Sequence, residues 1–391
     1  MTMVRPTDNF GRLHDESAFT VLARATAFER QGRDIINLGI GQPDFPTPQH
    51  IVDAATRALR DGHHGYTPAN GILPLREAIS HSLGQRFGVD VSPEQLLIVP
   101  GGKFAIFTAI QMFGEPGVEI IHPDPCFPIY RSIVEFTGAT PIPLPMREDH
   151  GFAFSAQEAL SLINERTRMI IINSPANPTG GVTPKKELDL LVAGLERYER
   201  VAILSDEIYG AMTYDGQRHI SLLSYPSIRD RLIHLDGVSK SYAMTGWRLG
   251  WSSWPANLYD SAYRLAINSY SCVSSISQWA AIAALNGPQA CVTAMVAEFD
   301  TRRRLVVESL NGLPGMSCVM PSGAFFAFPN VTGTGWQANA LARALLEEAG
   351  VAVIAGPDFG TYGKGHLRVS YASSAKNLKR AADRIGEFLS G

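Results

Sequence analysis

The chain has 391 residues, of which 45% are hydrophobic and 18% are charged, a composition typical of a globular protein long enough for two domains. Its formal net charge of -3 at pH 7 and its isoelectric point near 6.4 argue against a nucleic-acid-binding protein, which needs a basic surface. No run of 18 apolar residues occurs, so no membrane-spanning segment is predicted.

The N-terminal residues 1–14 are polar and lack the apolar segment of a secretion signal. Four cysteines, Cys126, Cys272, Cys291 and Cys318, lie far apart without paired spacing, which argues against a disulfide framework or a zinc site. The ten histidines show no metal-binding spacing, and we predict no metal site. Unpaired cysteines suit a reducing compartment, so we expect a cytoplasmic protein.

Helices and strands are predicted to alternate along the chain. Helical spacing of apolar residues predicts helices over residues 17–31, 49–61, from 73, 102–113, 184–198, 256–270, 274–286, 288–310, 337–349 and around 378–389. Short apolar runs predict strands over residues 35–38, 96–99, 118–121, 169–172, 201–204, 232–235, 249–254, 324–328, 351–354 and 367–370. The alternation is typical of an α/β fold built on a largely parallel sheet.

The most informative stretch is GVSKSYAMTGWRLG, residues 237–250. Lys240 follows an apolar strand closely, and α/β folds bind ligands at the carboxyl ends of their strands. A desolvated lysine has a lowered pKa and becomes a nucleophile towards carbonyl groups. Ser239 and Arg248 offer donors for a phosphate group on such a carbonyl compound. A lone lysine in a loop is more often a solvated surface residue, so the argument depends on the surrounding pattern.

That pattern resembles the lysine signature of the class I/II, fold type I pyridoxal-phosphate (PLP) aminotransferases, of the aspartate-aminotransferase-like kind. The resemblance covers roughly residues 16–391. It implies a large domain with a mostly parallel seven-stranded sheet sandwiched by helices, and a smaller α/β domain. The implied boundaries are 1–47 for an N-terminal arm and part of the small domain, 48–290 for the large PLP-binding domain, and 291–391 for the C-terminal small domain. It also implies that Lys240 carries PLP as a Schiff base.

Asp206 in the string SDEIY comes directly after a predicted strand, where a buried carboxylate is costly unless it has a partner. A helix cap or a surface carboxylate is the ordinary alternative. The resemblance makes Asp206 the partner of the PLP pyridinium nitrogen, which needs an ionised carboxylate nearby. It also implies that Asn177, in the string NPTG, and Tyr209 bind the phenolic oxygen of PLP.

The turn Gly101-Gly102-Lys103 leads from a strand into a helix, a ready site for an anion. Its spacing fits neither a dinucleotide-binding nor a nucleotide-triphosphate motif. The resemblance places the PLP phosphate at this turn. It further implies that Phe127 stacks on the pyridine ring, where many aspartate-type relatives have tryptophan, and that Tyr66 crosses a dimer interface to the partner's cofactor. A homodimer with shared active sites is therefore expected.

The substrate residues follow from the same resemblance. Arg368, in the string LRVSY on a predicted strand, is expected to bind the α-carboxylate bidentately. Gly41, in a loop rich in glycine and proline, Phe127 and Asn177 are expected to line the substrate site. Lys103 lies where aspartate-type relatives place a lysine near a distal carboxylate, which favours aspartate or glutamate. A surface lysine on a helix remains the alternative.

The predicted activity is transfer of the amino group of an L-amino acid to a 2-oxo acid by a ping-pong mechanism, with Lys240 as the catalytic base and acid. Two alternatives remain open. Lyases, oxidases and decarboxylating synthases of the same fold share these residues, because the cofactor-binding residues do not choose which bond breaks. A transcription regulator uses this fold behind a DNA-binding domain, and the roughly 15 residues before the first predicted helix argue against it.

Overall fold

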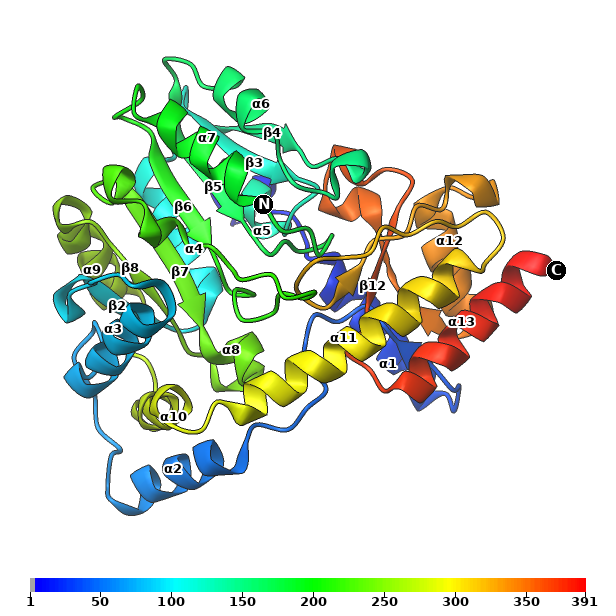
Figure 1. Ribbon diagram of the computed structural model, residues 1–391, viewed down its shortest axis with the longest axis horizontal. Coiled ribbons are helices and arrows are strands. Elements are labelled where there is room, and N and C mark those ends of the chain that lie inside the picture. The colour runs from blue at the N-terminus through cyan, green and yellow to red at the C-terminus, as the bar shows by residue number, and fades with distance from the viewer. Residues whose placement is uncertain (1–3) are drawn as a thin grey trace.

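The computed structural model describes residues 4–391 and is built around a sheet of seven strands (Figure 1). In the order β2-β8-β7-β6-β5-β3-β4, the sheet has parallel pairing from β7 to β4, and β8 is antiparallel to both of its neighbours. The strands are β2 (Leu96–Val99), β3 (Glu119–Asp124), β4 (Thr140–Pro145), β5 (Thr167–Asn173), β6 (Ala202–Asp206), β7 (Leu232–Gly237) and β8 (Gly250–Ser253). The predicted α/β fold with a mostly parallel seven-stranded sheet is confirmed.

Helices cover both faces of this sheet, and the central strands β3, β5, β6 and β7 are therefore buried at every position except Arg168. Ile170 and Ile172 pack in the hydrophobic cluster of α2 (Gln49–Arg60), α3 (Leu73–Phe87), α7 (Lys185–Leu195) and α10 (Ser275–Asn286). Met169 and Ile171 alternate with them and pack with α4 (Gly102–Phe113), α5 (Ile129–Thr137) and α9 (Ala256–Tyr270). A short helix, α6 (Ala156–Ser161), is capped by Ser155, whose hydroxyl accepts from the Glu158 N–H.

Strand β4 and helix α5 are absent from the elements predicted from sequence. The sequence of β4, Thr-Pro-Ile-Pro-Leu-Pro, contains three prolines, which cannot donate to a strand ladder. The N–H of Thr140 points towards β3 and donates to the carbonyl of Val118 at 2.8 Å. Pro141, Pro143 and Pro145 occupy the alternate positions of the strand, where an N–H would point away from β3. β4 is the edge of the sheet, the one place where such a strand is tolerated.

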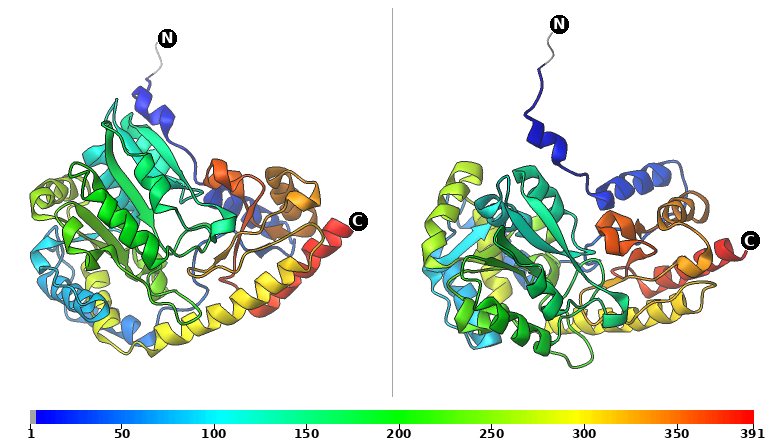
Figure 2. Two further views of the ribbon diagram at one scale, coloured as in Figure 1. Left: turned by 45° about the horizontal axis from the view of Figure 1, so that its top comes forward. Right: turned by 90° about the horizontal axis from the view of Figure 1, so that it is seen from above.

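A second group of elements comes from the two ends of the chain. Strand β1 (Ile36–Asn37) pairs with β10 (Val351–Ala352), and β11 (Ile354–Ala355), β12 (Leu367–Ser370) and β9 (Phe326–Ala327) form a three-stranded antiparallel sheet. Helices α11 (Ala290–Asn311) and α13 (Ala375–Ser390) pack side by side, as Figure 2 shows, and α1 (Ser17–Arg30) and α12 (Ala338–Ala344) complete this group. Its hydrophobic cluster differs from the two on the faces of the large sheet, but it also includes Tyr209, Met212 and Tyr214 from the segment after β6. The predicted division into domains, with its boundaries, stays a prediction.

One predicted strand differs from the structure. Residues 351–354 form two short strands in different sheets, rather than one strand. Before β2, Ser92 accepts a hydrogen bond from the Glu94 N–H at 3.3 Å and begins a single turn of 3-10 helix, Pro93–Gln95. Within residues 4–391, no single helix is long and apolar enough to cross a membrane, and α10 and α11 meet the length and hydropathy requirements only as a pair bent by 80°.

Candidate active site

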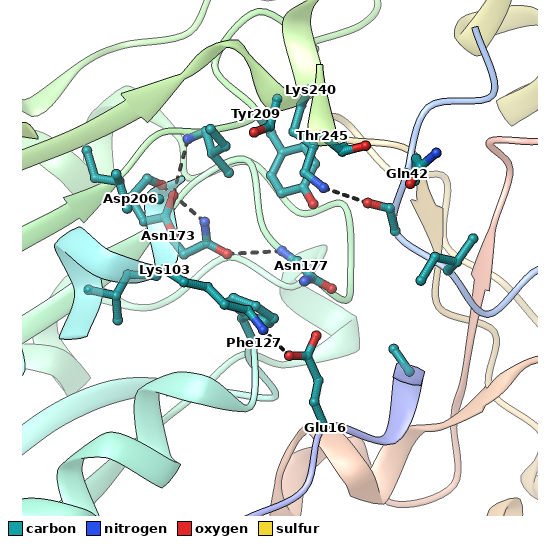
Figure 3. A pocket seen from close by; sticks show the side chains of 18 of the residues that line it. Glu16, Gln42, Lys103, Phe127, Asn173, Asn177, Asp206, Tyr209, Lys240 and Thr245 are labelled. Atoms are coloured by element: carbon teal, nitrogen blue, oxygen red, sulfur yellow. Dashed lines mark hydrogen bonds and ion pairs between the residues drawn. The ribbon is translucent and has the colours of Figure 1, made fainter. Parts of the chain in front are cut away.

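The carboxyl ends of β5, β6 and β7 meet beside a cavity of about 450 Å³ (Figure 3). Because neighbouring parallel strands end at the same edge, Asn173, Asp206 and the segment that carries Lys240 come together there. The second group of elements closes the other side of the cavity with Arg368 from β12 and the loop of Gly41. The predicted site residues that line it are Gly41, Gly102, Lys103, Phe127, Asn177, Asp206, Tyr209, Ser239, Lys240, Arg248 and Arg368.

Lys240 lies on the one-turn helix α8 (Val238–Ser241) that follows β7. Its Nζ donates to the backbone carbonyl of Gly41 at 2.5 Å and lies 5.7 Å from the centroid of the Tyr209 ring. Burial, together with the positive charges of Arg368 and Arg248, lowers the pKa of Lys240 to about 8. The amine is therefore available as a neutral base and nucleophile at mildly alkaline pH, which an ordinary surface lysine is not.

Asp206 is the last residue of β6 and is buried. Its Oδ2 accepts from the Tyr130 hydroxyl at 2.6 Å, and its Oδ1 accepts from the Ile208 N–H at 3.2 Å. Burial raises the pKa of Asp206 to about 6, and these two hydrogen bonds act in the opposite direction. The site thus holds a buried carboxylate that is largely ionised at neutral pH. It forms no salt bridge with another described residue, so it is suited to a cationic group of a ligand.

A chain of polar contacts leads from β5 to Arg368. The Nδ2 of Asn173 donates to the backbone carbonyl of Asp206 at 3.1 Å, and its Oδ1 accepts from the Asn177 N–H at 3.0 Å. The Oδ1 of Asn177 in turn accepts from the Nη1 of Arg368 at 2.9 Å. Asn177 is thereby held in place by both halves of the cavity wall.

Arg368 is buried between the rings of Phe326 and Phe359, whose centroids lie 4.7 and 4.8 Å from its guanidinium carbon. Its Nη2 donates to the carbonyl of Gly39, and its Nε is a buried donor without a partner among the described residues. Burial lowers the pKa of Arg368 to about 10, against the opposing charges of Tyr209 and Glu16. Since an unpartnered buried donor is costly, this guanidinium is suited to an anionic ligand.

Gly101 precedes α4 with a φ of +84°, a conformation that favours glycine. A Cβ at this position would lie 2.3 Å from the Nη2 of Arg248, so a side chain there would displace the guanidinium. Arg248 itself is anchored by donation to the Thr245 carbonyl at 2.9 Å and to the Pro100 carbonyl at 3.3 Å. The helix N-terminus, Ser239 and Arg248 together form a pocket suited to a phosphate.

Two predicted site residues do not line the cavity. Gly101 is buried, precedes Gly102 in the chain and shapes the turn, as described above. Tyr66 is 94% exposed and lies outside the cavity. Its predicted contact with the cofactor of a partner subunit stays a prediction.

Residues 33–385 match the family Aminotransferase class I and II. The chain belongs to this family. The aminotransferase is 37% identical over 383 residues to an aspartate aminotransferase of Geobacillus stearothermophilus, a match that covers 96% of this chain and 97% of the relative. Among solved structures, the aspartate aminotransferase of Rhizobium meliloti matches with a TM-score of 0.94, 33% identity and 99% of both chains covered. An alanine aminotransferase of Pyrococcus furiosus matches with a TM-score of 0.93, 31% identity and coverage of 99% and 100%.

Sequence reasoning missed five charged or polar residues of the aminotransferase's cavity: Glu16, Gln42, Tyr130, Asn173 and Thr245. Tyr130 lies in the first turn of α5, three positions after Phe127, which precedes the helix. Residues three apart in a helical turn lie on the same side, so the two rings face the same cavity. Glu16 ends the N-terminal arm, and no sequence signal shows that this arm reaches the cavity.

Proposed function

We propose that the aminotransferase uses PLP to move the amino group of an L-amino acid to a 2-oxo acid, and that Lys240 would hold the cofactor and transfer the proton. The observation that carries the proposal is one cavity holding a lysine with its pKa lowered to about 8, a buried aspartate with its pKa raised to about 6, and a buried arginine with a free donor. The names of the relatives make aspartate the first amino donor to test.

The residues fit PLP. Gly101, Gly102, Ser239 and Arg248 would hold the phosphate, and Asp206 would hold the ring nitrogen protonated. Phe127 would cover the ring, Asn177 and Tyr209 would bind its phenolic oxygen, and Tyr66 of the partner subunit would reach the phosphate. When bound, PLP supplies an electron sink for the negative charge that develops at Cα.

The chain's own groups account for binding and proton transfer. Arg368 would bind the substrate α-carboxylate through its free Nε and its planar fork, with Gly41 and Asn177 beside it. Lys240 is a base whose pKa of about 8 would suit removal of the Cα proton and its return to the neighbouring carbon. The same residues would serve a lyase, an oxidase or a decarboxylating synthase of this fold, so the products decide between them.

The deciding experiment is absorbance spectroscopy of the purified protein supplemented with PLP. We expect a visible cofactor band that disappears with an L-amino donor, returns with 2-oxoglutarate and yields a 2-oxo acid in equal amount. A Lys240→Ala variant should bind the cofactor without this cycle. Oxygen consumption, or release of carbon dioxide, would replace the proposal by one of the alternative chemistries, and no cofactor band at all would overturn it.

We also propose a cytoplasmic homodimer with shared active sites, supported by the exposed Tyr66 and the free cysteines. Light scattering gives the oligomeric state directly. Mixing a Lys240→Ala chain with a Tyr66→Phe chain then tests whether the two copies share a site. Partial recovery of activity in the mixture is the expected result.

A further inference from the structure

At the mouth of the cavity Lys103, on α4, is fully partnered by groups of the chain itself. Its Nζ donates to the carboxylate of Glu16, and the side chains of the pair are 40% and 24% exposed (Figure 3). The same ammonium group lies 5.3 Å from the centroids of the Phe19 and Phe127 rings. A cation held by a carboxylate and two aromatic faces is already neutralised before any substrate arrives.

Glu16 comes from the N-terminal arm, immediately before α1, and makes no capping hydrogen bond to that helix. Its carboxylate therefore has no structural task in α1 that a substitution would disturb. Its charge is felt deeper in the cavity, because it opposes the lowering of the pKa of both Arg368 and Lys240. Glu16 thus belongs electrostatically to the substrate site.

Among the described residues that line the cavity, six are charged: Glu16, Lys103, Asp206, Lys240, Arg248 and Arg368. The proposed function assigns the last four to the cofactor, the Cα proton and the α-carboxylate. Only Glu16 and Lys103 then remain to meet a charged substrate side chain, and their neighbours Ala18, Phe19 and Phe127 are apolar.

We propose, on the basis of the proposed function, that Glu16 is a specificity-determining residue that lowers the preference of the site for dicarboxylic amino donors relative to donors with apolar or aromatic side chains. A distal carboxylate has to displace Glu16 from Lys103 or lie beside its negative charge. An apolar or aromatic side chain packs against Phe19 and Phe127 and leaves the ion pair intact.

The test compares kcat/KM for L-aspartate and L-phenylalanine in the PLP-loaded enzyme. In Glu16→Gln the ratio of aspartate to phenylalanine should rise about fivefold, the effect of one partly exposed charge pair of about 1 kcal/mol. Asp15→Asn is the matched control, because Asp15 is the residue before Glu16 and its side chain is exposed. This variant also removes one negative charge, and its ratio of aspartate to phenylalanine should stay unchanged. In a Lys103→Gln background, Glu16→Gln should lose most of its effect on the ratio.

The outcomes separate this inference from the proposed function. Absence of transamination by the unmodified enzyme with every donor contradicts the proposed function itself. Active enzyme whose ratio stays the same or falls in Glu16→Gln overturns the inference alone. An equal change in Asp15→Asn overturns it as well, because the effect would then come from general charge. Retention of the cofactor band in each variant shows that the site is folded.

Discussion

Removal of the Tyr130 hydroxyl should raise the pKa of Asp206. The hydroxyl donates to Oδ2 at 2.6 Å, and both side chains are buried, so Tyr130→Phe removes a donor from a desolvated carboxylate. A hydrogen bond to an ionised group contributes about 1.5–3 kcal/mol, which corresponds to about one to two pKa units. From a value of about 6, the pKa of Asp206 should therefore rise to about 7–8 in the apoprotein.

This shift changes the charge of the site at neutral pH. With a pKa of about 6, Asp206 is about nine-tenths ionised at pH 7, whereas in Tyr130→Phe it should be at most about half ionised. A protonated carboxyl cannot stabilise a pyridinium nitrogen. We therefore expect weaker cofactor binding at pH 7 and a kcat/KM about two- to tenfold lower for every donor.

Carbon-13 NMR of aspartate side-chain carboxyl groups in the apoprotein measures the pKa directly, with Asp206→Asn to assign the signal. Tyr270→Phe is the control, because it removes a tyrosine hydroxyl that donates instead to the backbone carbonyl of Ile98 at 2.8 Å. A shift of less than about half a unit in Tyr130→Phe, or an equal shift in Tyr270→Phe, would refute the reasoning.

Three further predictions follow from buried charges. Lys240→Met should abolish transamination yet stabilise the apoprotein by roughly 1–2 kcal/mol in thermal unfolding at pH 7, because below its pKa of about 8 the protonated amine is destabilised by burial. Arg368→Lys should lower kcat/KM about a hundredfold for aspartate and phenylalanine alike, because lysine lacks the planar fork; an effect on one donor only would contradict an α-carboxylate role. Burial lowers the pKa of His122 to about 4, so the unfolded chain binds a proton that the folded chain does not. Urea unfolding should show stability falling between pH 6.5 and 4, and His122→Gln should remove about 3 kcal/mol of that fall.

Much of the fold was predictable because both faces of the large sheet are covered by helices. Runs such as Met169 to Ile172 are then apolar at every position, and they stand out between helical segments. The edge strand β4 has no such run, and the small strands β10 and β11 are two residues each, too short for a period to show. Their existence depends on the neighbours with which they pair.

The site residues on strand ends and glycine turns were predictable, because those positions are set by local sequence and by the resemblance. Lys240, Asp206, Asn177 and Arg368 come from four separate segments, and the structure brings all of them to one cavity. Glu16 could not be found in this way. Its place opposite Lys103 depends on how the N-terminal arm crosses from one group of elements to the other, which is a long-range feature that no local pattern encodes.

A second chain gains little by adding a strand beside β4. The N–H groups of Thr140 and Met146 point inward to β3, and the prolines between them leave the outer edge with carbonyl acceptors but no donors. An added strand would form only half of its ladder, so intermolecular sheet growth of the kind that leads to fibres is disfavoured at this edge. Self-association therefore has to use surfaces made of side chains. The composition of such a surface can distinguish a second copy of this chain from other proteins, which a bare strand edge cannot do.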